Sequence, residues 1–559
     1  MTKQCTQCSK TFHIDSSDQA FYDRINVPAP TFCPSCRLQR RLSFRVERNI
    51  YQRTCDLTGK PILSVYNTTR PYPVYDIAAW WTDRWSPLTY GRDFDFKRLF
   101  FDQFSELQVV VPRLALIQQQ PMENSAYCNA ASRNKNCYLV FSTNQCEDCY
   151  YGSWVNSSKN CVDNYSILRC ELCYQCIDCK DCYHCWYAQD SRNCTDSYFI
   201  KSCIGCRNIA FCTNLVNAEY CLFNQAVTKQ VFEEFVQQLR AATSEQWNIY
   251  QQQYMDLRKK MFMRYYQGVN NEASTGHHIN NCKNCRDCFL VDASENIRYG
   301  VHLEFVKDAM DYSYWGQQAE QLYEVQASGY NITNLKFCNL CWSGCENLEY
   351  CDHSFSSKNC FGCVGLKKNE YCILNKQYTA TEYERLVDKI KQYMRTTKEY
   401  GEFFPMQLSP FDYNETLAQE FFPLTETDVQ QRGWRWKNKD QTDYQAQTYQ
   451  LPDRIEQVND DILQATLACR QCTKNYRIVA QELVFYRQEK LLIPRLCPNC
   501  RHLDRLAQRP KYDTWTRQCM CTQPEHNHNN RCVKEFVTPY SPNQPELIYC
   551  EDCYKKQVY

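Results

Sequence analysis

Cysteine pairs with the spacing of metal ligands occur near both ends of the chain. At each end, two Cys-x-x-Cys pairs are separated by the same interval. Each pair supplies two thiolates from one tight turn, so two pairs can close one tetrahedral Zn²⁺ site. The expected ligands are Cys5, Cys8, Cys33 and Cys36 near the start, and Cys469, Cys472, Cys497 and Cys500 near the end. The sequence therefore predicts a zinc ribbon at each end of the chain.

A third set of cysteines follows the second ribbon. Cys532, Cys550 and Cys553 offer three thiolates, and a fourth ligand must come from the residues before them. We favour Cys521, because thiolate is the commoner partner in such sites. The other candidates for this position are Cys519, His526 and His528. The sequence thus predicts a zinc-binding, treble-clef-like module at the C-terminal end, and three Zn²⁺ ions in all.

A related segment follows the first ribbon. When the two segments are aligned on Tyr66 and Tyr540, the positions of the three C-terminal thiolates hold Thr58, Asp76 and Ala79. The same alignment places the missing first ligand of the C-terminal module at residue 529, which is an asparagine. The N-terminal copy keeps only Cys55. We therefore predict a metal-free relic that is held together by an aromatic core.

The cysteines in the middle of the chain follow a period of three. Every cysteine from Cys128 to Cys221 lies a multiple of three residues from the next. A long strand would alternate with period two, and a helix would repeat every 3.6 residues. Period three suits very short strands that turn at regular corners, as in a β-solenoid. A loop-rich fold organised by metal is the alternative.

The middle of the chain is also duplicated. Cys137-Tyr-Leu-Val corresponds to Cys288-Phe-Leu-Val, and each copy ends in a helical pattern. The expected fold class is mostly β with helical segments, in which two zinc ribbons and two treble-clef-like modules flank a duplicated cysteine-rich β-solenoid. The expected segments are the first ribbon (1–50), the metal-free module with an aromatic helix (51–127), the first solenoid half with its helix (128–270), the second half with its helix (271–400), an extended connector (401–464), the second ribbon (465–510) and the zinc module (511–559).

Three roles are open to the central cysteines: metal or iron–sulfur binding, a ladder of disulfides, or packing in the interior. Free cysteine is among the most often buried residue types. The duplication favours packing, because Cys161 aligns with Ala309, and alanine can replace a packing residue but not a ligand. His277 and His278, which precede Cys282 and Cys285, are assigned to an exposed loop, and an additional zinc site formed with these cysteines is the alternative.

The chain carries 40 cysteines in 559 residues, too long for a small disulfide-stapled secreted fold. It starts without an apolar signal segment and has no apolar run long enough to span a bilayer. We expect a protein of the reducing cytoplasm with no membrane partner. A Gly-rich phosphate loop, a nucleophile elbow and a His-Glu-x-x-His motif are all missing from the sequence, which predicts that the chain is not an enzyme.

Arginines follow the second cysteine pair of each ribbon. Basic residues outnumber acidic ones in both ribbons, whereas the whole chain carries a net charge of +1, so the remainder is acidic. Because guanidinium groups match phosphate geometry, we predict a non-enzymatic zinc scaffold that binds nucleic acid, either structured RNA or a ribosomal surface. The expected contacts are Arg37, Arg40, Arg41, Arg45, Arg48, Arg501, Arg505 and Arg509. Two alternatives stay open: that these arginines pair with the acidic remainder of the chain, and that the molecule is a protein–protein interaction scaffold with purely structural zinc.

The ribbons resemble the probable-zinc-ribbon family. The resemblance rests on the Cys-x-x-Cys, Phe-Tyr and Cys-Pro-x-Cys-Arg pattern, which occurs twice, with Phe21-Tyr22 and Phe485-Tyr486 in the same register. It implies zinc but no activity. The Cys-Pro-x-Cys-Arg-x-Gln-Arg-Arg and Tyr-Gly-Arg-Asp-Phe-Asp-Phe stretches are also similar to those of uncharacterised cysteine-rich proteins of small-genome bacteria, and this likeness implies no function.

Overall fold

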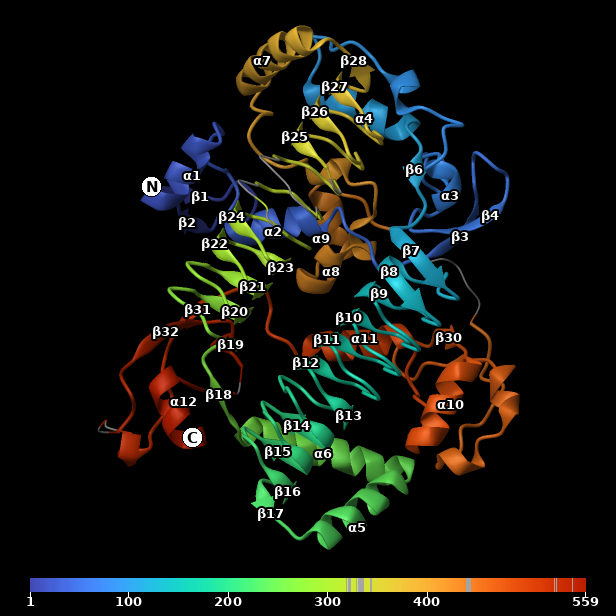
Figure 1. The fold of residues 1–559 in the computed structure, drawn as a ribbon, viewed down its shortest axis with the longest axis vertical. Helices are drawn as coiled ribbons and strands as arrows, with labels where there is room; N and C mark the ends of the chain where they lie inside the picture. Colours follow the sequence, from blue (N-terminus) through green and yellow to red (C-terminus); the bar gives the residue numbers. More distant parts are fainter. Residues whose placement is uncertain are drawn as a thin grey trace.

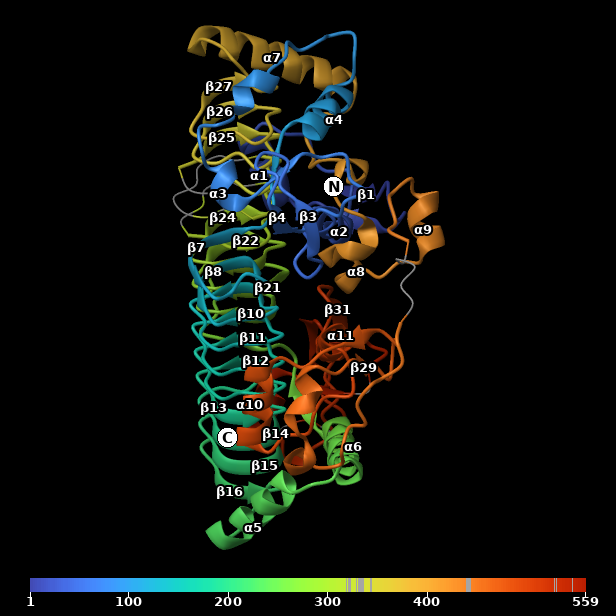
Figure 2. The ribbon, with the colours of Figure 1, turned by 90° about the vertical axis from the view of Figure 1, so that its right-hand side faces the viewer.

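Two stacks of short, parallel rungs form the long axis of the molecule (Figure 1, Figure 2). They belong to a mixed α/β chain in which most strand pairs are parallel. This computed structural model describes residues 1–559 except 318, 320–322, 328, 330–335, 342–343, 439–443, 527, 529 and 545. No helix in the described parts of the chain is both long enough and apolar enough to cross a membrane.

The first rung stack rises by one rung every 12 residues. Ser153 pairs with Tyr165, and Tyr165 pairs with Ile177, each in parallel register. The strands of this stack are β7 (Gln118–Glu123), β8 (Asn129–Lys135), β9 (Phe141–Asn144), β10 (Ser153–Asn156), β11 (Tyr165–Leu168), β12 (Ile177–Lys180), β13 (Tyr183–Trp186), β14 (Thr195–Lys201), β15 (Arg207–Thr213) and β16 (Glu219–Leu222). The antiparallel strand β17 (Gln225–Ala226) and helices α5 (Lys229–Arg240) and α6 (Ser244–Lys260) follow the last rung.

A left-handed residue at every third position makes the corners of the rungs. Asn160, Asp163, Ser166 and Arg169 have φ between 50° and 58°. This conformation costs asparagine and aspartate less than other non-glycine residues, and both are frequent here. The residue after each of these four corners points inward and is almost fully buried, as at Cys161, which is 1% exposed. The repeat of three in the sequence is therefore a corner, an inward side chain and one further residue.

The second rung stack is built in the same way and runs in the opposite direction along the long axis (Figure 1). Its described strands, with the short strand before them, are β19 (Gly268–Val269), β20 (Gly276–Asn280), β21 (Cys288–Asp292), β22 (Glu295–Arg298), β23 (Val301–Glu304), β24 (Lys307–Met310), β25 (Glu346–Glu349), β26 (Lys358–Phe361) and β27 (Glu370–Ile373). An antiparallel strand β28 (Lys376–Gln377) and helix α7 (Ala380–Thr396) again follow the last rung. The stacks touch where the rings of Trp154 and His302 lie 3.8 Å apart.

The two ribbons contain the same elements in the same order. The first has β1 (Thr2–Gln4), β2 (Thr11–His13), α1 (Ser16–Arg24) and α2 (Pro34–Leu42); the second has β29 (Leu467–Ala468), β30 (Asn475–Tyr476), α10 (Ala480–Glu489) and α11 (Pro498–Ala507). Helices α2 and α11 each begin directly after a cysteine, with proline at the first helical position, where its missing N–H costs nothing. The first ribbon packs on the second stack and the second ribbon packs on the first (Figure 1).

Each module that follows a ribbon pairs, through one of its strands, with a short strand that precedes a rung stack. The first consists of β3 (Tyr51–Thr54), β4 (Pro61–Ser64), β5 (Val74–Tyr75) and α3 (Ile77–Trp80); the second consists of β31 (Trp515–Gln518), β32 (Glu535–Thr538), β33 (Leu547–Tyr549) and α12 (Glu551–Val558). Strand β5 pairs in parallel with β6 (Arg113–Leu114), which precedes the first stack. Strand β33 pairs in parallel with β18 (Phe262–Arg264), which precedes the second stack.

Aromatic side chains fill the space between these parts. Helix α4 (Phe100–Val110) buries Phe100, Phe104 and Leu107 completely. The connector between the second stack and the second ribbon forms short helical turns, α8 (Leu417–Phe421) and α9 (Glu426–Gln431) among them. Gln39 of α2 donates a hydrogen bond to the Tyr413 hydroxyl at 2.6 Å, so this connector lies against the first ribbon.

We predict that Cys161→Ala lowers the free energy of unfolding by only about 1 kcal/mol, because it leaves a small cavity in the rung interior. Urea unfolding followed by circular dichroism measures this change. The matched substitution Cys33→Ala should instead unfold the first ribbon, because metal binding supplies the folding energy of such a module. Equal damage from both substitutions would contradict the packing role of the central cysteines.

Candidate metal centres

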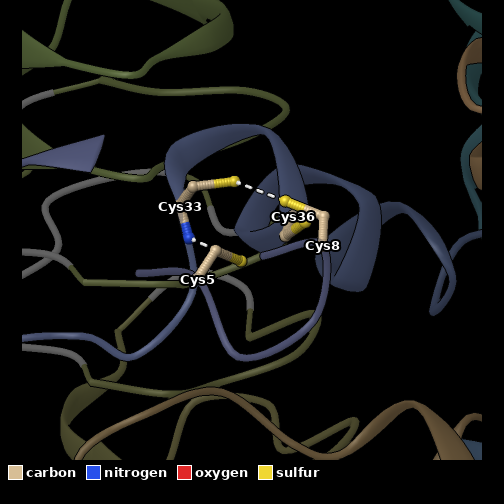
Figure 3. Close-up of side chains that lie close together, drawn as sticks. All are labelled: Cys5, Cys8, Cys33 and Cys36. Atoms are coloured by element: carbon tan, nitrogen blue, oxygen red, sulfur yellow. Dashed lines mark hydrogen bonds between the residues drawn. The ribbon is translucent and has the colours of Figure 1, made fainter. Parts of the chain in front are cut away.

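Four cysteine side chains of the first ribbon converge between the β1–β2 turn and the start of α2 (Figure 3). The sulfur atoms of Cys8 and Cys33 lie 3.7 Å apart, and the four ligand atoms all lie within 4.8 Å of one another. A tetrahedral ion with Zn–S bonds of about 2.3 Å needs sulfur atoms about 3.8 Å apart. The Cys33 N–H also donates to the Cys5 sulfur at 3.3 Å. These residues fit a zinc ion without rearrangement.

The second ribbon repeats this geometry with Cys469, Cys472, Cys497 and Cys500. Its Cys472 and Cys497 sulfur atoms are also 3.7 Å apart. Although burial alone would raise the pKa of the Cys469 thiol, backbone N–H groups of Cys497, Cys472 and residue 471 lower it to about 6. A thiol with a lowered pKa readily gives the thiolate that a metal ion binds.

The third cluster contains Cys519, where we had expected Cys521. Cys519 lies with Cys532, Cys550 and Cys553, with all four sulfur atoms within 4.8 Å of one another, and the Cys550 N–H donates to the Cys519 sulfur at 3.2 Å. Cys521 instead belongs to a neighbouring group with His526, His528 and Cys553, whose ligand atoms lie within 4.8 Å of one another.

Comparison with the N-terminal module shows why the sequence alignment on Tyr66 and Tyr540 did not place Cys519 in the third cluster. There, the Asp76 N–H donates to the Cys55 sulfur at 3.2 Å, and the Cys55 N–H donates to the Lys60 carbonyl at 2.8 Å. In the C-terminal module the Cys519 N–H donates in the same way to the Lys534 carbonyl, at 2.8 Å. Cys55 therefore corresponds to Cys519, and the loop that follows is longer in the C-terminal module. An alignment at constant interval pointed instead to residue 529, which lies outside the described residues.

Cys55 belongs to no group of potential metal ligands among the residues that the structure describes. Around it, Trp80 is fully buried, its indole N–H donates to the Pro112 carbonyl at 3.1 Å, and its ring lies 5.3 Å from that of Trp85. The metal-ligand groups found in the described chain also contain none of the cysteines from 128 to 372. These central cysteines are buried in the rung interiors, where the Cys161 thiol lies 3.5 Å from the Cys170 carbonyl oxygen.

The ribbon arginines, which we expected to contact phosphate, are largely buried within the fold. Seven of the eight are at most 9% exposed, and only Arg48 is half-buried. Their partners belong to the same chain, as the alternative of intramolecular pairing anticipated. Arg40 pairs with Glu324 at 2.6 Å, and Arg45 pairs with Glu47 at 2.7 Å. Arg48 donates to the Ser153 hydroxyl at 3.2 Å, and Arg509 pairs with Asp178 at 2.7 Å.

In each stack, one aspartate pairs with two arginines of the ribbon that packs on that stack. In the second stack, Asp311 lies 2.8 Å from Arg37 and 3.2 Å from Arg41. In the first stack, the corresponding Asp163 lies 2.9 Å from Arg501 and 3.2 Å from Arg505. Both aspartate side chains are fully buried. The two interfaces therefore repeat one arrangement, in which consecutive turns of a ribbon helix present two guanidinium groups to one carboxylate.

A tyrosine completes each interface. The Arg37 guanidinium lies 5.3 Å from the centre of the Tyr299 ring, and the Arg501 guanidinium lies 4.9 Å from that of Tyr151. The Tyr151 hydroxyl also donates to Glu482 of the second ribbon at 2.5 Å. Sequence reasoning did not single out Asp163 or Asp311. The signal was present, because both halves of the duplication keep aspartate at this position.

His277 and His278 lie in β20 at the contact between the stacks, and the expected exposed loop is wrong. His277 is 4% exposed. His278 lies 3.5 Å from Asp178 and 3.2 Å from Asp190. Although burial alone would lower the pKa of His278, these carboxylates raise it to about 9. The two carboxylates therefore favour the charged form of the imidazole at this interface.

Comparisons with known proteins add little to this geometry. No protein-family model matches the chain, and no curated protein matches its sequence. One solved structure, described as a "putative acetyltransferase" from Desulfovibrio desulfuricans G20, is 6% identical over 50% of this chain and 81% of that chain. Its TM-score is 0.10, so the likeness carries no argument.

We predict that Asp163→Asn lowers the free energy of unfolding by about 3–5 kcal/mol, because it leaves two buried guanidinium groups without a counter-charge. Glu219→Gln is the matched control. It removes a carboxylate from an exposed pair with Arg207 on the same stack and should cost less than about 1 kcal/mol. Urea unfolding of the two variants gives both values, and similar costs would show that the buried pair does not hold the ribbon.

Proposed function

We propose that this chain is a non-enzymatic scaffold that binds a protein partner and uses Zn²⁺ purely for structure. The observation that carries the proposal is that the ribbon arginines form ion pairs within the chain. These pairs join each ribbon to a stack. Four thiolates fill the coordination of a tetrahedral ion, which leaves no position for a substrate. On this account zinc fixes the ribbon helices, and the helices fix the stacks.

We further propose that the two rung stacks are the halves of a duplicated β-solenoid and that the protein works in the reducing cytoplasm. The step of 12 residues between paired strands and the buried side chains that follow the corners of the central rungs support the solenoid. The 40 free cysteines support a reducing compartment, because an oxidising one favours disulfides.

The outward face of the stacks favours a protein over nucleic acid. Lys135 and Lys159 both pair with Glu147, at 3.7 and 3.2 Å. The second stack repeats this alternation of charge, since Glu295 pairs with Lys307 at 3.8 Å. Ladders of opposite charge neutralise themselves, whereas a phosphate backbone needs a run of basic side chains.

One cleft favours nucleic acid as a second candidate. It has a volume of about 950 Å³ and lies between the first ribbon and the segment that follows α7. Its lining includes the exposed cations Arg395, Lys398 and Arg432 and the aromatic rings of Phe32 and Trp434. Cations beside aromatic faces suit a single strand, whose phosphates and bases they would contact separately.

Affinity purification of the full chain from cell extract, with and without nuclease, tests these candidates. We expect a protein partner that stays bound after nuclease treatment and at raised salt. In the variant Arg395→Glu/Lys398→Glu/Arg432→Glu the partner should be retained. RNA that copurifies with the parent chain and is lost in this variant would favour the second candidate and contradict the first.

A further inference from the structure

A second group of metal-binding side chains adjoins the four-cysteine cluster of the C-terminal module. Cys521, His526, His528 and Cys553 have ligand atoms that all lie within 4.8 Å of one another. The Cys521 sulfur is 3.2 Å from Nδ1 of His526, and the Cys553 sulfur is 3.6 Å from Nε2 of His528. These separations suit two thiolates and two imidazoles around one tetrahedral ion. Cys553 belongs to both groups.

The three additional ligands lie in one inserted loop. In the N-terminal module the corresponding turn runs directly from Cys55 to Lys60. In the C-terminal module the turn is longer, and its base is closed by the Cys532 N–H, which donates to the Cys521 carbonyl at 2.9 Å. The N-terminal module keeps its strands and helix without such a loop. The insertion is therefore additional to the elements that the two modules share, and it carries three side chains of types that can bind metal.

The loop also orients its ligands as a metal site requires. Nδ1 of His528 lies 3.0 Å from the Asn530 carbonyl, which accepts a hydrogen bond from that nitrogen. The proton is then on Nδ1, and the lone pair of Nε2 faces the Cys553 sulfur. A carbonyl partner on the outer nitrogen is the usual arrangement of a metal-binding histidine. Cys521 is fully buried, so its thiol is held at the site and away from solvent.

We propose that the C-terminal module binds two Zn²⁺ ions that share the thiolate of Cys553. Two tetrahedral ions require eight ligand bonds, and the seven side chains of the two groups supply them only when one sulfur binds both ions. A thiolate sulfur has lone pairs for two metal bonds. Each cysteine releases its proton on binding, and each histidine binds in its neutral form. The ions are bound and undergo no reaction.

The shared centre would tie the inserted loop to helix α12. Cys550 and Cys553 lie at the start of α12, and β33, just before it, pairs with β18 at the entrance to the second stack. Tyr554 of the same helix donates to Asn214 of the first stack at 3.2 Å. The second ion would thus strengthen the point where the chain passes from one stack to the other. This inference rests on the structural zinc proposed above for the four-cysteine cluster.

Native mass spectrometry of the full chain expressed with zinc tests the proposal. We expect four Zn²⁺ ions in the parent chain and three in His526→Ala/His528→Ala, which alters only the inserted loop. Three ions in both proteins would overturn the second ion. Cys472→Ser is the matched control for the proposed structural zinc: it should lose one ion from the second ribbon, and an unchanged count there would contradict that role instead.

Cobalt substitution tests the shared sulfur. In the chain loaded with Co²⁺, two ions bridged by one thiolate couple magnetically, so the susceptibility should fall below that of four independent ions. The coupling should disappear in His526→Ala/His528→Ala, while the absorption of the four-thiolate cobalt sites is retained. Four bound ions with no coupling would overturn the bridge.

Discussion

Two guanidinium groups held by one buried aspartate form the interaction on which the rest of this structure depends. It occurs twice, at Asp163 and at Asp311, and each time the arginines come from a ribbon at the opposite end of the chain. A buried carboxylate is costly without a partner, and so is a buried guanidinium. Each stack is therefore complete only when a ribbon helix covers its aspartate. Because each charged group requires the other, these ion pairs hold together segments that are far apart in the sequence.

The four-cysteine clusters of the ribbons act on this interaction by fixing where the ribbon helices begin. In each ribbon the second cysteine pair starts the helix that carries the arginines, so the position of the sulfur atoms fixes the phase of the helix. The guanidinium groups then reach one carboxylate from consecutive turns. A buried ion pair is weak evidence for net stability, because desolvation offsets most of the attraction. A ribbon docked in another register would bury its charges without partners, so the pairs favour the observed register.

Much of this architecture could be predicted from the sequence, because it follows from short-range spacing. The cysteines of both ribbons and the corners at every third residue are local patterns, and the structure places Cys5, Cys8, Cys33 and Cys36 together as the spacing indicates. The membership of Cys519 in the third cysteine cluster could not be found in this way, because a loop insertion separates it from the cysteines that follow. The sequence showed that the ribbon helices are basic, but it did not show which acidic residues pair with their arginines. Whether a basic helix faces solvent or a buried aspartate depends on contacts between residues far apart in the chain.

Hydrogen exchange measured by mass spectrometry on Cys497→Ser tests the coupling between metal, ribbon and stack most directly. If the second ribbon holds the first stack, disruption of its four-cysteine site should speed amide exchange in the rungs around Asp163 and Asp178. The rungs around Asp311, which the first ribbon covers, should exchange as in the parent chain. Unchanged exchange around Asp163 in a variant that has lost its zinc would contradict the account.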